Sequence, residues 1–262
     1  MKNLLILLFI NIVTFTYGQK SNSTFKVYDA ILYKNKPNLT DRGFNNINVI
    51  YEDGILSTNY KEENKRSRYW RFIDFPKLKK EAIKSNKQNI PVVLDIEHWK
   101  IEDPLDKEYA TKQYYEIISN YRKIDTRNLI SVFHYSSISQ PLYNISNVIY
   151  PAYYTHSDNY QEWENMVRYS IRRMKKMGNK PIIAFIWPQY NEVPDRHDLG
   201  FKFVDREFWR KQLELIYKLC DGVVIWTHYK DHLGNKIEFS ENMPWYIETL
   251  NFMNDYDING NQ

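Results

Sequence analysis

Cysteine is almost absent from this chain of 262 residues, which contains only Cys220. A single cysteine excludes an intramolecular disulfide, so the fold must be held together by its hydrophobic core. A chain of this length is long enough to bury such a core. Cys220 ends an apolar helical pattern, which predicts a buried thiol rather than a reactive nucleophile.

Glycine is also scarce, with eight residues, and the sequence G-x-G-x-x-G does not occur. A doubly wound open sheet usually carries such a glycine-rich phosphate turn after its first strand, so that architecture is disfavoured. The G-x-S-x-G pattern of a serine nucleophile and the H-E-x-x-H pattern of a zinc protease are missing as well.

Neither sign of charge is in large excess, because 36 Lys and Arg residues face 32 Asp and Glu residues, for a net charge of +4. No nucleic-acid-binding motif accompanies this mild charge, and we expect no nucleic-acid partner. Aromatic residues, in contrast, make up 16% of the chain, including 22 Tyr and 7 Trp. Such residues either fill a core or stack on the flat faces of sugar rings.

The long apolar run of the chain lies at its N-terminus. Lys2 precedes an apolar stretch over residues 4–15, and residues 16–18 offer a cleavage region for a signal peptidase. This pattern predicts a secretory signal peptide over residues 1–18 and one catalytic domain over residues 19–262. The run is too short for a comfortable transmembrane helix, so we expect no stable membrane insertion. The expected location is secreted or periplasmic, in a bacterium.

Short apolar runs alternate with longer helical patterns along the rest of the chain. The expected strands cover residues 25–32, 47–51, 91–96, 129–134, 147–150, 181–187 and 222–226, and the expected helices cover residues 76–85, 106–122, 160–177, 205–219 and 244–253. Continuous apolar strands alternating with helices predict a parallel sheet buried on both faces. A (β/α) barrel uses roughly 250 residues. We therefore predict an α/β fold with a single TIM-like (β/α) barrel, distorted in having seven clear strands.

Asp95 and Glu97 lie at the carboxyl end of the strand expected over residues 91–96. Side chains two apart in a strand point to the same side, so the two carboxyl groups share a face. Barrel enzymes carry their active sites at this end of the strands. Two close carboxylates repel each other, and one then holds a proton near neutral pH, as a general acid must. These two residues are the candidate catalytic pair; the competing interpretation is an acidic pair on a solvated loop.

The segment VVLDIEHW, which contains this pair, resembles the D-x-E strand of the hyaluronidase family of glycoside hydrolases. Other segments resemble that family in the same order: FHY at residues 133–135, IYPAYY at residues 149–154, residues 181–190 and CDGVVIW at residues 220–226. The resemblance implies a distorted barrel. It also implies retaining, substrate-assisted hydrolysis, in which the 2-acetamido oxygen of the sugar attacks its own anomeric carbon.

The resemblance also implies a role for particular residues. Glu97 is the general acid and then the general base, and Asp95 orients and stabilises the acetamido group. Tyr154 forms a hydrogen bond near that group, and Trp226 helps to form the floor under the sugar. Phe185 falls near the place where the family has a tyrosine, which leaves the acetamido requirement open.

Aromatic and amide side chains after the other strands suit sugar rings and hydroxyl groups. The predicted substrate contacts are Tyr135, Tyr154, Trp187, Gln189, Tyr190, Trp226 and His228. Glu192 is a second catalytic carboxylate if the mechanism uses two carboxyl groups. His134 either lines the same cavity or is an ordinary buried histidine. No cofactor or metal is expected, although His228, Asp231 and His232 form a loosely patterned metal-site candidate.

The sequence thus predicts a secreted glycoside hydrolase that acts on a polysaccharide or oligosaccharide. One alternative is a lysozyme-like D-x-E muramidase that cleaves peptidoglycan, because the string LDIE suits that group too. The other is a glycan-binding barrel without catalysis. Carbohydrate is the expected partner in each case, and the pattern does not specify an oligomeric state.

Overall fold

The computed structural model describes residues 25–58, 71–135, 137–191 and 196–258. The signal peptide predicted over residues 1–18 and the candidate carboxylate Glu192 lie outside the described residues. None of the helices in the described part of the chain is both long enough and apolar enough to cross a membrane.

Two four-stranded sheets with parallel pairing form the centre of the molecule. The strands of the first sheet follow the order β2-β1-β10-β9, and those of the second follow β3-β6-β7-β8. Their bounds are β1 Lys26–Ala30, β2 Asn45–Asn46, β3 Asn48–Tyr51, β6 Val92–Asp95, β7 Ile130–His134, β8 Tyr150–Pro151, β9 Ile183–Ile186 and β10 Gly222–Trp226. The α/β class and the parallel pairing predicted from the sequence are confirmed.

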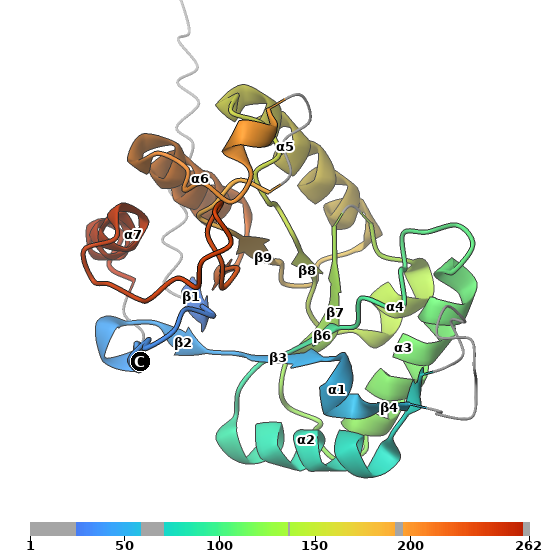
Figure 1. Ribbon diagram of the computed structural model, residues 1–262. Helices are drawn as coiled ribbons and strands as arrows, with labels where there is room; N and C mark the ends of the chain where they lie inside the picture. The colour runs from blue at the N-terminus through green and yellow to red at the C-terminus, as the bar shows by residue number, and fades with distance from the viewer. Residues whose placement is uncertain (1–24, 59–70, 136, 192–195, 259–262) are drawn as a thin grey trace, which may run out of the picture.

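Contacts at both edges join the two sheets. At one edge a single residue, Ile47, separates β2 from β3, so one extended segment pairs first with β1 and then with β6. At the other edge isolated parallel bridges link Ile149 with Ile182 and Ala152 with Phe185. The strands surround a common interior (Figure 1), although the pairing among the described residues does not form one continuous ladder.

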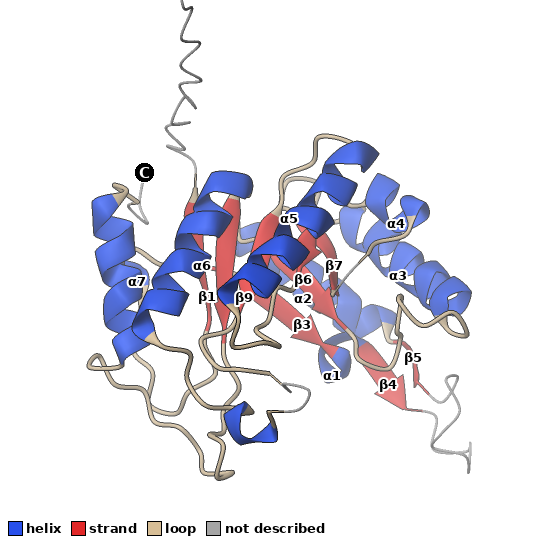
Figure 2. Cartoon of the chain, turned by 90° about the horizontal axis from the view of Figure 1, so that it is seen from above, coloured by secondary structure: helices blue, strands red, loops and turns tan. Residues whose placement is uncertain are grey.

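The helices lie outside the strands, as Figures 1 and 2 show. Their bounds are α1 Glu52–Ile55, α2 Phe75–Gln88, α3 Lys107–Arg122, α4 Gln140–Ile145, α5 Tyr160–Met177, α6 Arg206–Leu219 and α7 Pro244–Asp255. Several helices begin after a residue whose side chain caps their first turn. For example, the Asp205 carboxylate accepts a hydrogen bond from the Phe208 N–H at the start of α6.

The core has two layers because side chains alternate along each strand. Val93 on β6 belongs to the cluster inside the ring of strands, together with Tyr154, Phe185 and Trp187. The neighbouring Leu94 belongs to the cluster between the strands and the helices. Both faces of the strands are therefore buried, which explains their continuous apolar sequences. Cys220 is buried, as predicted.

Several short elements differ from the prediction. The one-turn α1, the six-residue α4 and the antiparallel pair β4 Leu56–Thr58 and β5 Arg71–Ile73 are not predicted by the sequence patterns. Elements this short show too few periods of a hydrophobic pattern to be recognised. The strand expected over residues 147–150 is observed at Tyr150–Pro151, so only Tyr150 lies in both ranges.

Candidate active site

Asp95 and Glu97 line a cavity of about 590 Å³ at the carboxyl end of β6. Tyr135, Tyr154 and Trp226, which follow or end three other strands, line the same cavity. The predicted carboxylate pair and three of the predicted substrate contacts are therefore brought together in space. Their common position follows from the parallel pairing, which gathers the carboxyl ends of the strands at one end of the molecule.

The backbone between the two carboxylates is held from the helix side. Ile96 is buried, and the Tyr114 hydroxyl on α3 lies 3.1 Å from both its amide nitrogen and its carbonyl oxygen. The hydroxyl accepts a hydrogen bond from the N–H and donates one to the C=O. One buried side chain thus satisfies both backbone groups of Ile96 at the point where the β6 ladder ends.

Glu52 holds the same segment from the neighbouring strand. It follows β3, which pairs with β6, and its carboxylate accepts a hydrogen bond of 2.6 Å from the His98 N–H. The other carboxylate oxygen lies 3.1 Å from the Arg71 guanidinium. Glu52 is not among the residues predicted from the sequence. The signal that could have found it is an acidic residue directly after an apolar strand, the same signal that identified Asp95.

The two carboxyl groups of the pair have different environments. The pKa of Asp95 is raised to about 7, first by burial and then by the negative charges of Glu97 and Glu52. Glu97, in contrast, is exposed to the cavity. Asp95 is thus a carboxyl group whose surroundings favour the protonated form near neutral pH.

Aromatic rings form the wall of the cavity beside the carboxylates. The rings of Tyr154 and Trp226 are stacked, with centroids 5.5 Å apart and an interplanar angle of 24°. The Trp226 indole N–H donates a hydrogen bond of 3.2 Å to the Tyr51 hydroxyl. Tyr51 is a second residue absent from the sequence prediction; it lies directly opposite Asp95 in the pairing of β3 with β6. Burial and the charges of Asp95 and Glu97 raise its pKa.

Four of the seven predicted substrate contacts do not line this cavity: Trp187, Gln189, Tyr190 and His228. Gln189 is fully buried, accepts a hydrogen bond of 2.9 Å from the Trp187 indole N–H and donates to the carbonyl oxygens of Phe201 and Lys230. Tyr190 packs in the core on the helix side of the strands. Neither Gln189 nor Tyr190 is among the residues that line the cavity. Gln189 instead fixes the ring of Trp187, which is itself buried.

His228 lies in an aromatic group beside the cavity. Its ring centroid is 6.3 Å from that of Trp226 and 4.7 Å from that of Tyr229, whose side chain is 43% exposed. Among the described residues, no three His, Cys, Asp or Glu side chains come together as a metal site. The candidate set of His228, Asp231 and His232 is included in that finding.

His134, at the end of β7, lines the cavity and is only 1% exposed. Burial lowers its pKa to about 3, so the ring is neutral in ordinary buffers. Neither ring nitrogen has a hydrogen-bond partner among the described residues. The sequence offered two interpretations of His134, a cavity residue and a buried histidine, and both describe its position.

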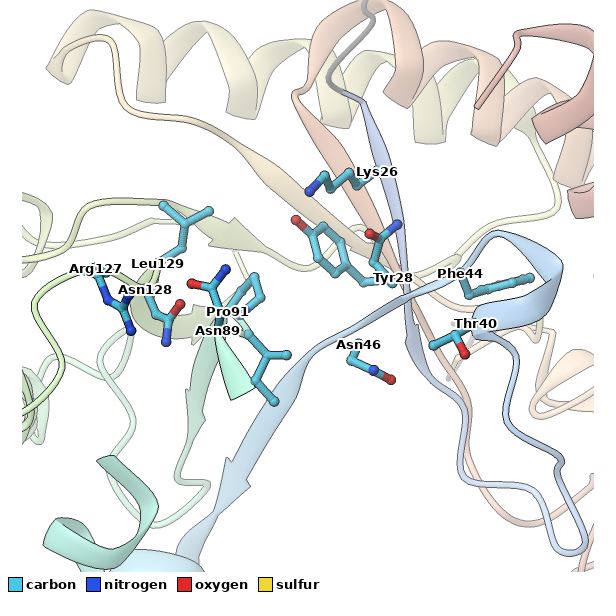
Figure 3. A pocket seen from close by; sticks show the side chains of 12 residues that line it. Lys26, Tyr28, Thr40, Phe44, Asn46, Asn89, Pro91, Arg127, Asn128 and Leu129 are labelled. Carbon is cyan, nitrogen blue, oxygen red and sulfur yellow. The ribbon is translucent and has the colours of Figure 1, made fainter. Parts of the chain in front are cut away.

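A second cavity, of about 350 Å³, lies at the opposite end of the strands (Figure 3). Lys26 begins β1, while Pro91 and Leu129 directly precede β6 and β7. Because it is formed at the amino ends of the strands, this cavity is separate from the one that holds Asp95 and Glu97.

No family model matches the chain, and no curated sequence matches it. Its fold is similar to that of bee venom hyaluronidase. The monoclinic crystal structure of that enzyme aligns with 88% of this chain and 97% of the other, with a TM-score of 0.56 and 12% identity. The structure of its complex with a hyaluronic acid tetramer aligns with 90% and 97%, with a TM-score of 0.54 and 12% identity.

A β-glucuronidase from Bacteroides uniformis is also similar, with a TM-score of 0.50 and 8% identity. The alignment covers 81% of this chain but only 28% of that protein. At such identities these similarities establish a shared fold, and the chemistry has to be argued from the site itself.

Proposed function

We propose that this protein is a glycoside hydrolase that cleaves a polysaccharide or oligosaccharide. The observation that carries the proposal is the pair Asp95 and Glu97 in a cavity walled by Tyr135, Tyr154 and Trp226. A volume of about 590 Å³ is typical of ligand-binding cavities. The fold shared with an enzyme crystallised with a hyaluronic acid tetramer supports a carbohydrate ligand.

The fold proposed for this enzyme is a distorted (β/α) barrel. Its seven parallel strands are β1, the β2–β3 segment, β6, β7, β8, β9 and β10, each next to the following one. The bridges between the Ile149–Ala152 region and β9 support closure at one edge, and the continuous β2–β3 segment supports it at the other. In such a barrel the carboxyl ends of the strands carry the reaction.

In the proposed mechanism Glu97 is the general acid and then the general base. Glu97 is exposed to the cavity, where the oxygen of a glycosidic bond can approach it, while Asp95 is more buried. Before substrate binds, the proton of the pair is held by Asp95. A substrate N–H that donates a hydrogen bond to Asp95 favours its ionised form, and the proton of the pair is then available at Glu97.

The substrate supplies the nucleophile in this proposal. The 2-acetamido oxygen forms a bond to the anomeric carbon as Glu97 donates its proton to the departing oxygen. Water then attacks the same carbon, the bond from the acetamido oxygen to that carbon breaks, and Glu97 takes a proton from the water. Two displacements at the carbon leave the product with the original configuration. Tyr154 forms a hydrogen bond near the acetamido group, and Trp226, stacked on Tyr154, forms the floor under the ring. A second carboxylate placed as nucleophile is then unnecessary.

We also propose that residues 1–18 direct export of the enzyme from a bacterial cell, so that it meets its substrate in the periplasm or outside the cell. The apolar run over residues 4–15 supports this part of the proposal.

A panel digestion tests the enzyme class. The protein, the Glu97→Gln variant and the control variant Glu108→Gln are incubated with hyaluronan, chondroitin, chitin oligomers, peptidoglycan and several neutral and acidic polysaccharides. Glu108 is an exposed residue of α3 that does not line the cavity, so the control carries the same chemical change elsewhere. Mass spectrometry reads the products.

We expect cleavage of at least one glycan by the parent and by Glu108→Gln, and its loss in Glu97→Gln. Cleavage restricted to hyaluronan, chondroitin or chitin oligomers, which carry 2-acetamido sugars, supports the substrate-assisted mechanism. Cleavage of peptidoglycan alone favours the muramidase alternative. If every glycan stays intact while one of them binds, the hydrolase proposal is wrong and a glycan-binding protein replaces it.

A further inference from the structure

The cavity of about 350 Å³ at the amino ends of the strands, which we call the amino-end cavity, serves no step of the proposed reaction. Its described lining contains two cationic residues, Lys26 and Arg127, and no Asp or Glu. The cavity that holds Asp95 and Glu97 is lined instead by four carboxylates and one lysine. The two ends of the interior are therefore suited to ligands of different charge.

Lys26 points into the interior of the ring of strands. Lys26 and Tyr28 are two residues apart on β1, so their side chains lie on the same face of the strand. Tyr28 belongs to the interior cluster, whereas Val27 between them belongs to the cluster on the helix side. In Figure 3 the Lys26 amine and the Tyr28 hydroxyl extend from β1 toward the side of the cavity on which Asn128 lies. The strand thus places a cation at the amino-end mouth of the interior.

The donor groups of this lining are largely unused by the protein. Neither the Lys26 ammonium nor the Tyr28 hydroxyl forms a hydrogen bond or ion pair with a described residue. Burial raises the pKa of Tyr28 to about 12, so its hydroxyl keeps the proton that it can donate. Across the cavity, Nη2 of Arg127 donates to the carbonyl oxygen and to Oδ1 of Asn86, at 3.1 and 3.0 Å. No carboxylate of the described residues pairs with this guanidinium group.

Acceptor oxygens lie in the same lining. The amide of Asn128, which is 6% exposed, donates to the carbonyl oxygen of Ser85 at 2.8 Å and to the carboxylate of Asp125 at 2.7 Å. Both of its hydrogens are then used, and Oδ1 remains as an acceptor. The amide of Asn45 donates to the carbonyl oxygen of Val27 at 3.3 Å, and its Oδ1 also remains. Such oxygens accept hydrogen bonds from hydroxyl groups.

This combination of groups restricts the chemistry of a ligand. An inorganic anion would pair with the cations but would leave the amide oxygens without donors, and a neutral sugar would leave the positive charges without a partner. A sugar that carries a carboxylate satisfies both. Ile90, Pro91 and Leu129 add apolar lining for the C–H groups of a sugar ring. A volume of about 350 Å³ is at the lower end of the range for ligand cavities, which limits the ligand to a small one.

We propose that the amino-end cavity binds an acidic sugar, a single hexuronate unit. Lys26 is the direct partner of its carboxylate, and Arg127 adds positive potential from the other side of the cavity. The hydroxyl groups of the sugar donate hydrogen bonds to the amide oxygens of Asn45 and Asn128. This inference goes beyond the proposed function, because it gives the protein a second, noncatalytic carbohydrate site at the opposite end of the strands from the candidate catalytic pair.

NMR titration of the ¹⁵N-labelled protein tests this site without requiring hydrolysis. Sodium D-glucuronate, D-glucose and sodium phosphate are added separately at constant ionic strength, because salt screens exposed charges. Glucuronate and glucose differ only in the carboxylate that replaces a hydroxymethyl group, so the pair isolates the effect of charge. The backbone N–H signals of Asn46 and Asn128 report on the amino-end cavity, and those of Glu97 and Glu102 report on the active site.

We expect glucuronate to shift the Asn46 and Asn128 signals saturably, and glucose and phosphate to bind at least about tenfold more weakly. Lys26→Gln should weaken glucuronate binding about tenfold or more, because a charge-assisted hydrogen bond is lost. Arg127→Gln should weaken it about two- to fivefold. The control Lys87→Gln removes an exposed charge near the end of α2 that does not line the cavity, and it should change the affinity less than about twofold.

Asn46→Asp keeps the test valid if Lys26→Gln does not fold. Asn46 is exposed and its side chain forms no hydrogen bond with a described residue, so the fold should tolerate the change. The new carboxylate should weaken glucuronate binding at least about tenfold by repulsion.

Signals that no probe moves, or equal binding of glucuronate and either glucose or phosphate, overturn the inference. An affinity that neither Lys26→Gln nor Asn46→Asp lowers overturns it as well. The result does not depend on glycan cleavage, so a failure of this proposal and a failure of the proposed function are distinguishable.

Discussion

The carboxyl groups of Asp95 and Glu97 are two residues apart and yet have different environments. Asp95 ends the buried strand β6 and lies near Glu52, whereas Glu97 begins the turn that follows Ile96 and faces the cavity. Burial of a carboxyl group disfavours its charged form, so the structure can hold a proton near neutral pH at Asp95 while Glu97 remains accessible. This division of roles is a property of single residues and leads to two predictions.

Asp95→Asn should stabilise the protein at alkaline pH. The folded-state pKa, about 7, is raised above the ordinary value of 3.8, so folding is favoured by protonation. The contribution of this protonation to the stability of the folded protein is complete below the ordinary pKa of the carboxyl group, and it is lost as the pH rises through about 7. Asparagine does not ionise, and the variant should gain up to about 4 kcal/mol over the parent above pH 7. Urea unfolding of both proteins at about pH 4.5 and pH 8 measures the difference in their free energies of unfolding. An equal difference at both pH values contradicts the assignment of the raised pKa to Asp95.

Tyr114→Phe should lower kcat about 10- to 100-fold and leave KM within about threefold of the parent. The change removes both hydrogen bonds to the backbone of Ile96, which lies between the two carboxyl groups of the proposed catalytic pair. Tyr121→Phe is the matched control, because it deletes a buried hydroxyl from the same helix without touching Ile96. Kinetics on a substrate from the panel decide the question, and equal losses in both variants would show a general effect of loosening α3.

At the scale of elements, periodic segments are predictable from the sequence and short ones are not. The helix over residues 160–177 has the predicted bounds, and β6 and β10 lie at the predicted positions. Those segments carry several turns or a continuous apolar run. The turn α1 and the β4–β5 pair depend on contacts with neighbouring elements, which a local pattern does not encode.

The prediction of site residues has the same limit, because a local sequence pattern does not show which other elements contribute side chains to the site. The rule that strand ends carry function identifies Asp95, but Tyr51 and Tyr114 reach the site from other elements, and only the pairing of β3 with β6 and the packing of α3 place them there. The polarity of Gln189 suggests a contact with substrate. Polarity does not reveal direction, however, and the side chain turns inward to bond Trp187.

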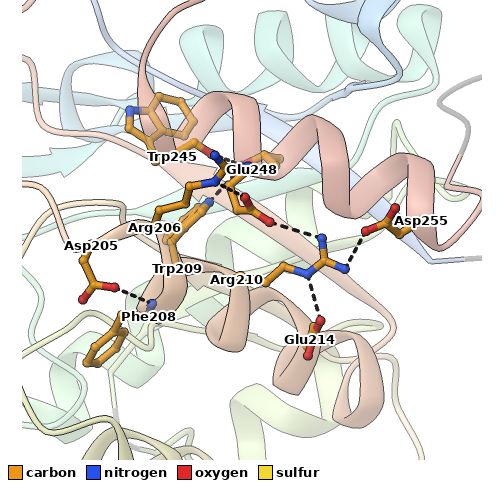
Figure 4. A network of polar contacts seen from close by, with 10 residues as sticks. Asp205, Arg206, Phe208, Trp209, Arg210, Glu214, Trp245, Glu248 and Asp255 are labelled. Carbon is orange, nitrogen blue, oxygen red and sulfur yellow. Dashed lines mark hydrogen bonds and ion pairs between the residues drawn. The ribbon is translucent and has the colours of Figure 1, made fainter.

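Helices α6 and α7 are joined by a network of ionic contacts (Figure 4). Glu248 on α7 is 7% exposed and binds Arg206 and Arg210 of α6. Arg210 also contacts Glu214 and Asp255. We predict that Glu248→Ala lowers the free energy of unfolding by about 1 to 2 kcal/mol, because a nearly buried carboxylate loses its hydrogen bonds to two guanidinium groups, while Arg206 is largely exposed and Arg210 keeps Glu214 and Asp255. Activity on glycans should change less than about twofold, since the network lies away from the cavity.

The control for this prediction is Glu238→Ala, which removes an ion pair with Lys34 whose two side chains are largely exposed. Exposed ion pairs contribute little to stability, so Glu238→Ala should lower the free energy of unfolding by less than about 1 kcal/mol. Denaturant unfolding of both variants provides the comparison. Equal costs for the two variants would show that burial of Glu248 does not strengthen its ion pairs.

At the scale of the whole molecule, parallel pairing determines where chemistry can occur. All strands of the two sheets run in the same direction, so Tyr51, Asp95, Tyr135 and Trp226 meet at one end although they are far apart in the sequence. The cavity at the opposite end holds no part of this group. The aromatic residues, abundant in the composition, fill the interior and also wall the site.

The most direct test of this account is the initial rate of glycan cleavage by the parent and by Glu97→Gln, measured side by side near pH 6 on the substrate that the panel identifies. Both proteins are first shown to have the same melting temperature. We predict that Glu97→Gln loses about 10³-fold in rate, the scale expected for removal of a general acid. A variant that keeps the parent rate within about threefold would contradict the assignment of Glu97 and, with it, the proposed catalytic pair.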